Sequence, residues 1–498
     1  MSTWDLLGQG ANLLFSPEPM LMLLLGMVVG LVFGGLPGFS SGNTAALMLP
    51  LTLGMSTGGA IIFLGGIYCG AQYGGGVPAI LIGTPGTTGA IATVFDGYAM
   101  AKQGRADEAL GISLMSSVIG GVIASIIAIF LIRPIASVAL EFGPAEMALL
   151  AVLGLTVVAS IVGAEVRKGL LSVVAGLLVA AMASDPNLGK PRCNFGFLEL
   201  YDSIPFTPLI MGMFAFPALM ELIADMHNPA AAKFAKVGNN IMKGVIYCIR
   251  KPFLSIWSAL IGLFVGIIPG AGVDVGAFMA YGQAKMLSKS PETFGKGNPE
   301  GVLAAEGANN GVAAGALVPA MALGIPGGTT TAVMISALTL HGVTIGPQII
   351  RNFPAEVYAL MLSALVCAIL TYPMGIAFNK MAVRILSVNR AYLIPAVFIL
   401  CMAGSYADRK FIFDNYLCFV AGLGGIAMAK GGYPAAPFIL AFILEPILEQ
   451  NFIRATLISQ GDLGIFVSST ISVVLWVGIV VTLFLPVLLK FYRKLTHK

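Results

Sequence analysis

Hydroxyl and amide side chains gather beside four Pro-Gly pairs in this chain of 498 residues. Glycine lets a ligand approach the backbone closely, and Ser, Thr and Asn add side-chain oxygens and N–H groups. Such residues can hold a sodium ion through oxygens and an anion through N–H donors. The predicted substrate-binding residues are Pro37, Gly38, Ser40, Ser41 and Asn43 at the first pair, Thr84, Pro85, Gly86, Thr87 and Thr88 at the second, and Pro326, Gly327, Thr329 and Thr330 at the fourth, with Asn309 and Asn310 upstream of it.

The second and fourth Pro-Gly pairs lie in a stretch that occurs twice. Residues 66–90 and 307–331 are identical at ten of 25 positions when aligned at an offset of 241. A shorter similarity, between residues 35–44 and 266–277, precedes each copy and holds the other two pairs. We expect a membrane helix to end or unwind at each pair, because proline lacks a backbone donor and glycine admits positive φ. Paired interruptions of this kind indicate the binding site of a transporter.

A half-helix that begins after each Pro-Gly pair has free N–H groups and a positive dipole end. Two such ends facing one cavity suit a substrate with several carboxylates. The simpler alternatives are that the small residues only let helices pack closely and that the threonines only cap kinked helices. We favour a site, because Pro, Gly and hydroxyl residues coincide in both copies.

The composition indicates a membrane protein. Hydrophobic residues make up 57% of the chain and charged residues 10%, where a soluble protein carries about 25% charged residues. The length accommodates on the order of 11 to 14 membrane segments, some of them re-entrant. The small net charge of +4 lies in loops, so nucleic acid is not an expected partner. The absence of HExxH, GxSxG, P-loop and CxxC motifs gives no support to an enzyme.

Asp274 is the carboxylate that we expect within the membrane, four residues after Gly270. An ionisable group at that depth is a functional hypothesis by default. We predict that Asp274 and Gly270, with Asn43 and Thr44 at the equivalent break, bind a coupling ion, either sodium or a proton. The alternative is a salt bridge between Asp274 and Lys285. If coupling lies elsewhere, Glu306 with Asn309 is the next choice.

The distribution of Lys and Arg predicts the topology. None occurs before Lys102, whereas residues 223–252 and the C-terminal tail carry several. By the positive-inside rule, the N-terminus is outside and the C-terminus is cytoplasmic. We predict a first membrane repeat at 1–222, a cytoplasmic basic linker at 223–252 and a second membrane repeat at 253–498. The fold class is therefore an all-α polytopic membrane protein with two inverted-topology repeats and broken or re-entrant helices at a central site.

Four stretches of the chain resemble the large membrane subunit of the tripartite tricarboxylate transporters. They are GLPGFSSGNTAALMLP, GGGVPAILIGTPGT, PGAGVDVGAF and EGANNGVAAGALVPAMALGIPGGTTTAVM, and the family's regions match at 35–44, 74–111, 266–276 and 306–331. The resemblance implies a subunit of the bacterial inner membrane, so the N-terminus that the positive-inside rule places outside would be periplasmic. It also implies two partners, a small membrane subunit and a periplasmic solute-binding protein, and uptake of di- or tricarboxylates with sodium or protons. No cofactor is expected besides that ion.

Two other functions compete with ion-coupled import. A gated anion channel on the same repeats should show a continuous polar stripe through several helices, whereas the polar residues here concentrate at the broken segments. A structural scaffold gives no reason for duplicated Pro-Gly breaks.

Overall fold

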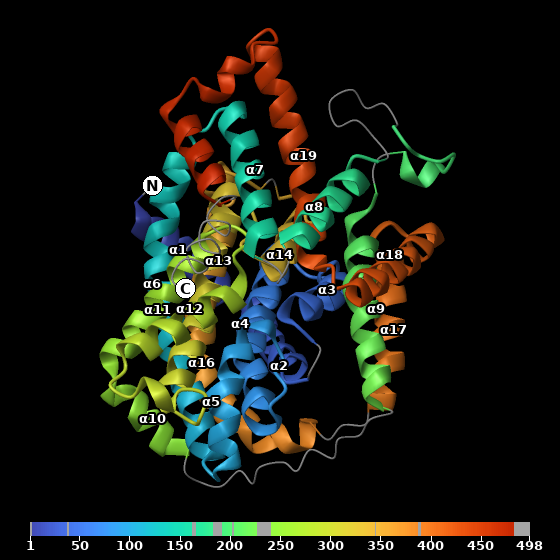
Figure 1. The fold of residues 1–498 in the computed structure, drawn as a ribbon. Helices are drawn as coiled ribbons and strands as arrows, with labels where there is room; N and C mark the ends of the chain where they lie inside the picture. Colours follow the sequence, from blue (N-terminus) through green and yellow to red (C-terminus); the bar gives the residue numbers. More distant parts are fainter. Residues whose placement is uncertain are drawn as a thin grey trace, which may run out of the picture.

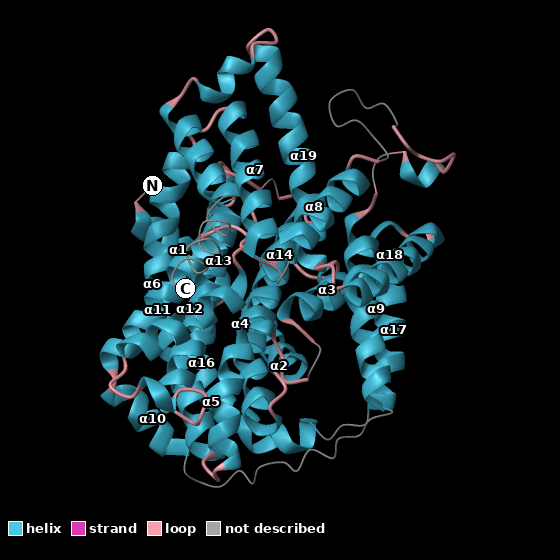
Figure 2. Ribbon diagram, viewed as in Figure 1, coloured by secondary structure: helices cyan, strands magenta, loops and turns pink. Residues whose placement is uncertain are grey.

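The computed structural model describes residues 2–36, 39–161, 166–182, 192–201, 204–226, 241–343, 345–386 and 390–482. Within these ranges the regular structure is helical and contains no strand (Figure 2). The prediction of an all-α membrane protein is confirmed, because several of the helices are long and apolar. Figure 1 shows α4 near the centre of the molecule, with other helices around it.

The helices of the first half of the chain are α1 (Thr3–Leu14), α2 (Pro17–Gly34), α3 (Ser41–Thr52), α4 (Thr57–Ile82), η1 (Thr88–Ala90), α5 (Ile91–Lys102), α6 (Ala106–Ala139), α7 (Pro144–Ile161), α8 (Val166–Ala180), η2 (Leu198–Leu200) and α9 (Phe206–Met226). Those of the second half are α10 (Ile241–Arg250), α11 (Pro252–Ile267), α12 (Gly272–Leu287), η3 (Pro291–Thr293), α13 (Pro299–Leu323), α14 (Thr329–Leu340), α15 (Ile349–Asn352), α16 (Pro354–Leu386), α17 (Arg390–Arg409), α18 (Ile412–Gly431), α19 (Ala435–Ile458) and η4 (Leu463–Val467).

The number of helices that are long and apolar enough to cross a membrane is smaller than the number of apolar runs in the sequence suggested. Among the described residues, five are long and apolar enough: α2, α4, α6, α16 up to Ala382, and α18. A sixth span results if α10 and α11, which meet at an angle of 85°, count as one. Other apolar runs form shorter helices, such as Pro144–Thr156 and Phe206–Met220. Of the predicted linker 223–252, residues 227–240 lie outside the described residues, and the rest belongs mainly to α9 and α10.

The two copies of the repeated stretch form two similar helices, α4 and α13. Each contains a proline in its last turns and ends at a glycine with a left-handed backbone, Gly83 at φ 71° and Gly324 at φ 73°. An L side chain rarely adopts this conformation, so glycine stops each helix before the Pro-Gly pair. The predicted ends of these two helices are therefore confirmed.

Small residues allow α4 and α13 to lie unusually close to their neighbours. A Cβ atom added to Gly26 of α2 would lie 2.2 Å from the carbonyl oxygen of Phe63 in α4. One added to Gly262 of α11 would lie 2.3 Å from that of Ala308 in α13. Close backbone approach of this kind is typical of membrane helix pairs. The α2–α4 and α11–α13 pairs thus form two similar packed units.

The short helices that follow the breaks pack across the two halves. Helix α3, after the first break, contacts α14 of the second half, and α12, after the third, contacts η1 and α5 of the first. Away from this centre, α9 packs against α17 and α18, while α19 packs against α7 and α8 (Figure 1). The residues after all four Pro-Gly pairs are thereby brought together.

Candidate functional site

A cavity of about 270 Å³ lies where the two halves meet. Its walls come from the starts of α3, η1, α12 and α14, from α4 and α9, and from α19 with the residue before it. The lining residues are Ser40, Ser41, Tyr68, Thr87, Thr88, Phe214, Gly270, Gly272, Val273, Asp274, Gly327, Gly328, Thr329, Thr330, Pro434, Ala435 and Leu440. Nine of these were predicted from the sequence: Ser40, Ser41, Thr87, Thr88, Gly270, Asp274, Gly327, Thr329 and Thr330.

Helix N-termini converge on the cavity. Ser40 caps α3, and its Oγ accepts a hydrogen bond from the backbone N–H of Asn43 at 3.1 Å. Helix α14 begins at Thr329, and the N–H of Gly328 donates to Thr331 Oγ1 at 3.0 Å. Helix α12 begins at Gly272, beside the same space. Each N-terminus carries a partial positive charge, and Asp274 is the one charged side chain among the described residues that line the cavity.

A chain of polar side chains joins the halves behind the cavity. Ser41 Oγ and Thr330 Oγ1 form a hydrogen bond of 2.9 Å, and Gln72 Nε2 donates to Ser41 Oγ at 3.2 Å. Asn309 Nδ2 donates to the backbone carbonyl of Gln72 at 3.2 Å. Three buried oxygens here have no hydrogen-bond partner: Gln72 Oε1, Asn309 Oδ1 and Thr87 Oγ1. Unsatisfied oxygens are costly in a dry interior, and a cation or a donor group of a ligand would satisfy them.

Two carboxylates lie near this centre. Asp274 is half-buried and lines the cavity from the first turn of α12, and the salt bridge to Lys285 considered above is not formed. Glu306 is fully buried on α13, where Thr93 Oγ1 donates to its Oε1 at 2.5 Å and Ser117 Oγ to its Oε2 at 3.4 Å. The described residues hold no group of three His, Cys, Asp or Glu side chains able to bind a metal ion. Asp274 is thus the acidic group in direct contact with the cavity.

The other predicted residues surround the site at different depths. Asn43 lines a neighbouring cavity of about 130 Å³, and buried Thr44 donates to the carbonyl of Ser40 at 3.0 Å. Asn310 Nδ2 donates to the carbonyl of Glu306 at 3.1 Å, one helical turn away. Four of the remaining residues do not line the cavity: Gly86 and Pro326 are buried, Pro85 is partly exposed, and Thr84 is exposed on the surface. Pro37 and Gly38 lie outside the described residues.

The sequence reasoning overlooked Gln72 and the apolar walls. Gln72 aligns with Ala313 in the second copy, so the comparison of the two copies gave no signal for it. The sequence held one sign of a role for Gln72: it is a single amide within a long, otherwise apolar and glycine-rich helix. An amide group needs a hydrogen-bond partner when it is buried. Tyr68 and Phe214 looked like ordinary membrane residues, and only their place in the fold brings them to the cavity.

Comparison with known proteins agrees with the resemblance seen in the motifs. The model of the tripartite tricarboxylate transporter TctA family matches residues 20–440. The "Uncharacterized 52.8 kDa protein in TAR-I ttuC' 3'region" of Agrobacterium vitis is 34% identical over 466 residues, which cover 94% of this chain and 92% of that protein. The "Uncharacterized protein in TAR-II ttuC' 3'region" of the same organism is 34% identical over 211 residues, 42% of this chain and 87% of that protein. No solved structure matches the chain significantly.

Proposed function

Because the chain belongs to the tripartite tricarboxylate transporter TctA family, we propose that it imports di- or tricarboxylates together with a coupling ion. It acts as the large subunit of a secondary transporter in the bacterial inner membrane. A periplasmic solute-binding protein delivers the substrate, and a small membrane subunit completes the complex.

The observation that carries this proposal is the polar cavity between the two halves. Its volume of about 270 Å³ is close to the lower end of the range for small-molecule sites, about 300 Å³. Hydroxyl groups of Ser40, Ser41, Thr329 and Thr330 and the starts of three helices supply donors for carboxylate oxygens. In this arrangement the substrate is held by neutral donors and dipoles, which release it more readily than a buried arginine pair.

Ion coupling is proposed at Asp274 and Gly270, which line the same cavity, and at Asn43 and Thr44 in α3. Moving one uncompensated negative charge inward against an inside-negative potential of 100 mV costs about 2.3 kcal/mol, so each charge of the substrate needs a cation. A carboxylate, backbone carbonyls at a helix break and neutral oxygens are suitable ligands for sodium. A proton carried by Asp274 would serve the same purpose.

The order of the helices supports a repeat, and the opposite charge flanks of the two halves are the reason to propose that its topology is inverted. The order α2, α3, α4, α5, α6 is matched by α11, α12, α13, α14, α16, and the long helices α6 and α16 have 34 and 33 residues. We propose that residues 1–222 and 253–498 are repeats related by an axis in the membrane plane, joined by a cytoplasmic linker at 223–252. The N-terminus is then periplasmic and the C-terminus cytoplasmic.

Uptake of a labelled carboxylate by vesicles that contain all three components tests the proposal. Asp274→Asn should weaken the dependence of uptake on sodium, or on pH if protons are coupled. Thr44→Val should have a milder effect, because it removes one neutral oxygen. Membrane abundance of each variant is the control. Unchanged ion dependence in both variants would place coupling elsewhere, and downhill flux without any ion dependence would favour a channel.

A further inference from the structure

Helix α10 is amphipathic and lies across the direction of the neighbouring apolar helix. Its axis makes an angle of 85° with α11. One face, formed by Gly244, Val245 and Cys248, is buried. The other face exposes Met242, Ile246 and Ile249, which form one stripe at helical spacing. If α11 runs along the membrane normal, α10 lies in the membrane surface with this stripe toward the lipid.

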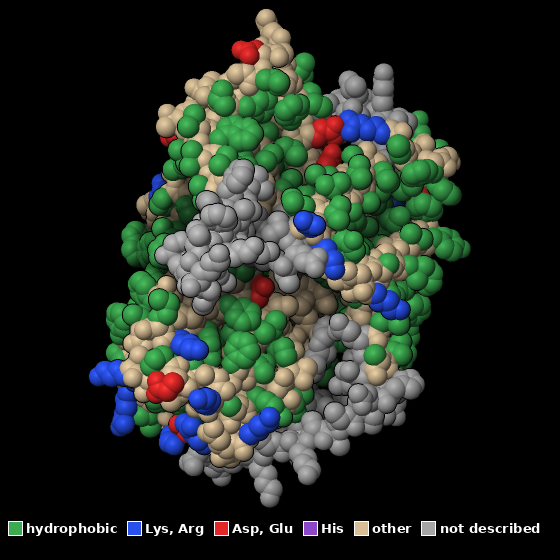
Figure 3. Space-filling view, viewed as in Figure 1, with side chains coloured by type: hydrophobic (Ala, Val, Ile, Leu, Met, Phe, Trp, Pro, Cys, Tyr) green, Lys and Arg blue, Asp and Glu red, His purple; other side chains and the backbone are tan. Residues whose placement is uncertain are grey.

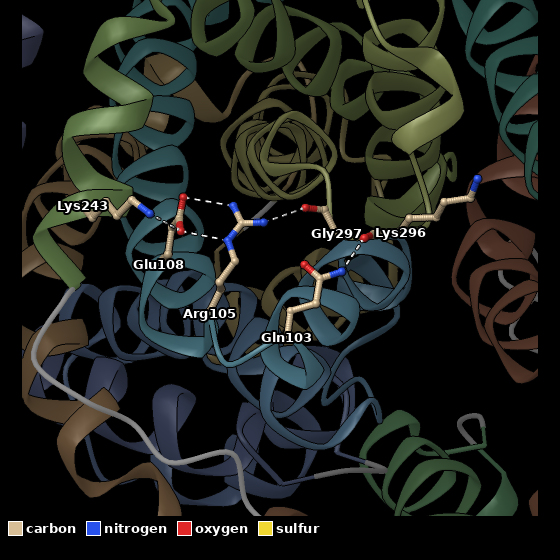
Figure 4. A network of polar contacts seen from close by, with 6 residues as sticks. All are labelled: Gln103, Arg105, Glu108, Lys243, Lys296 and Gly297. Atoms are coloured by element: carbon tan, nitrogen blue, oxygen red, sulfur yellow. Dashed lines mark hydrogen bonds and ion pairs between the residues drawn. The ribbon is translucent and has the colours of Figure 1, made fainter.

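Polar contacts fix α10 in this position. Lys243 of α10 forms an ion pair of 2.9 Å with Glu108 of α6, and Arg105 holds the same carboxylate through two hydrogen bonds of 3.0 and 3.1 Å (Figure 4). Gly244 lies so close to α6 that an added Cβ atom would be 2.2 Å from the carbonyl oxygen of Glu108. The apolar stripe is therefore held outward by a rigid support.

A basic pocket opens at the junction of α10 and α11. It has a volume of about 700 Å³, and its lining includes Arg250, Lys251 and Lys289 with the hydroxyl residues Ser288, Ser290 and Thr293. Lys251 pairs with Glu300 at 2.8 Å. No carboxylate of the described residues pairs with Arg250 or Lys289. The pocket thus has an excess of two positive charges, at the end of the molecule where Lys and Arg side chains gather in Figure 3.

Exposed aromatic residues lie beside the basic pocket. Phe253, which lines the pocket and is 71% exposed, stacks on Trp257 with ring centroids 6.4 Å apart and an interplanar angle of 4°. Aromatic rings of this kind are enriched where membrane proteins meet the headgroup region. Cations, hydroxyls, exposed aromatics and an apolar stripe therefore meet at one place.

We propose that this pocket binds the phosphate headgroup of an anionic phospholipid. Arg250 and Lys289 hold the phosphate, the hydroxyl residues contact the glycerol part, and the acyl chains lie along Met242, Ile246 and Ile249. Basic pockets at the ends of membrane helices favour such headgroups. A free phosphate has the same charged group but leaves the apolar stripe uncovered. This inference does not depend on the transported substrate.

The test measures lipid binding to the purified full chain in phosphatidylcholine nanodiscs by native mass spectrometry. Phosphatidylglycerol should bind saturably, and inorganic phosphate should not displace it. The double variant Arg250→Gln/Lys289→Gln should bind phosphatidylglycerol about thirty-fold more weakly, the effect of two charges near an anionic surface. Its melting temperature in phosphatidylcholine alone should equal that of the wild type, because both side chains are exposed.

A matched control separates the pocket from a diffuse basic surface. Lys285→Gln/Lys296→Gln removes the same charge from neighbouring exposed positions outside the pocket lining, and Figure 4 shows the Lys296 side chain extending away from the polar network. This variant should retain wild-type binding. Equal losses in both double variants, or displacement by inorganic phosphate, would overturn the proposal. If the pocket variant does not fold, the wild-type titration decides: equal binding of phosphatidylglycerol and added phosphatidylcholine contradicts a selective site.

Discussion

Gly42 lies at the junction of α3 and α14 and Gly282 lies within α12, and alanine should be harmful only at Gly42. A Cβ atom on Gly42 of α3 would lie 2.4 Å from Oγ1 and 2.8 Å from Cβ of Thr329 in α14, whereas one on Gly282 meets nothing within 4 Å. The Oγ1 atom can rotate away, but the Cβ atom can move only with α14. Restoring an ordinary contact of 3.4 Å requires a separation of roughly 0.6 Å between the two helices.

This separation acts directly on the proposed transport site. The hydrogen bond between Ser41 and Thr330, 2.9 Å long, crosses the same junction and would be stretched. Overpacking of this kind destabilises by about 1–3 kcal/mol, and a displacement near 1 Å at a reacting or binding centre can lower a rate by about a hundredfold. We expect Gly42→Ala to reduce carboxylate uptake at least tenfold by this estimate.

The assay is initial uptake by vesicles with all three components, normalised to the amount of inserted chain. Gly282→Ala is the control; Gly282 lies within α12 and outside the cavity lining, and an added Cβ atom there meets nothing within 4 Å, so this variant should transport normally. Normal uptake by Gly42→Ala, or an equal loss in both variants, would show that the α3–α14 junction does not shape the site.

Three further predictions concern stability. Gly26→Ala should lower the melting temperature, because its Cβ meets a backbone oxygen at 2.2 Å, whereas Gly8→Ala, with nothing within 4 Å, should not. Asp96→Ala should expose the loop at 294–298 to proteases, because one carboxylate oxygen accepts three backbone hydrogen bonds of 2.8 to 2.9 Å; unchanged cleavage would contradict this. Burial raises the pKa of Glu300, but hydrogen bonds from Lys251 and a serine together outweigh this effect. The pKa of Glu300 is therefore lowered from its ordinary value. Its stabilisation is present above the unfolded-state pKa of about 4.3 and is lost as the pH falls, so Glu300→Gln and wild-type melting temperatures should converge in acid.

Local chemistry made part of the site predictable. Glycine and proline determine where α4 and α13 end, and the duplication of their sequence indicated that both ends belong to one site. The hydroxyl residues that follow, Thr87 and Thr329 among them, are short and could only reach a ligand beside the helix start. For these residues, a position shortly after a Pro-Gly pair was enough to predict a place beside the cavity.

The rest depends on contacts between distant segments. Gln72 reaches Ser41 across 31 residues, and Asn309 reaches Gln72 across 237, and neither distance has a signature in the sequence. Thr84 and Thr87 each follow a glycine, yet Thr87, at the start of η1, lines the cavity, whereas Thr84 is exposed after the end of α4. The number of membrane-spanning helices could not be predicted either, because hydropathy does not distinguish a crossing helix from a short buried one.

The crossed packing of α3 on α14 and of α12 on η1 has a consequence for how the protein is made. When the ribosome has completed only the first half, the start of α3 and the turn at Thr87 can pack on helices of that half, such as α4, but they lack their contacts with α14 and α12. Lipid cannot satisfy their backbone groups. The uncovered polar groups must therefore stay near water, or beside the insertion machinery, until the partner helices are made: α12 begins 184 residues after η1 (88 to 272), and α14 begins 288 residues after α3 (41 to 329). A stop codon between the halves should leave a product that the cell degrades, whereas supplying both halves as separate chains should rescue it.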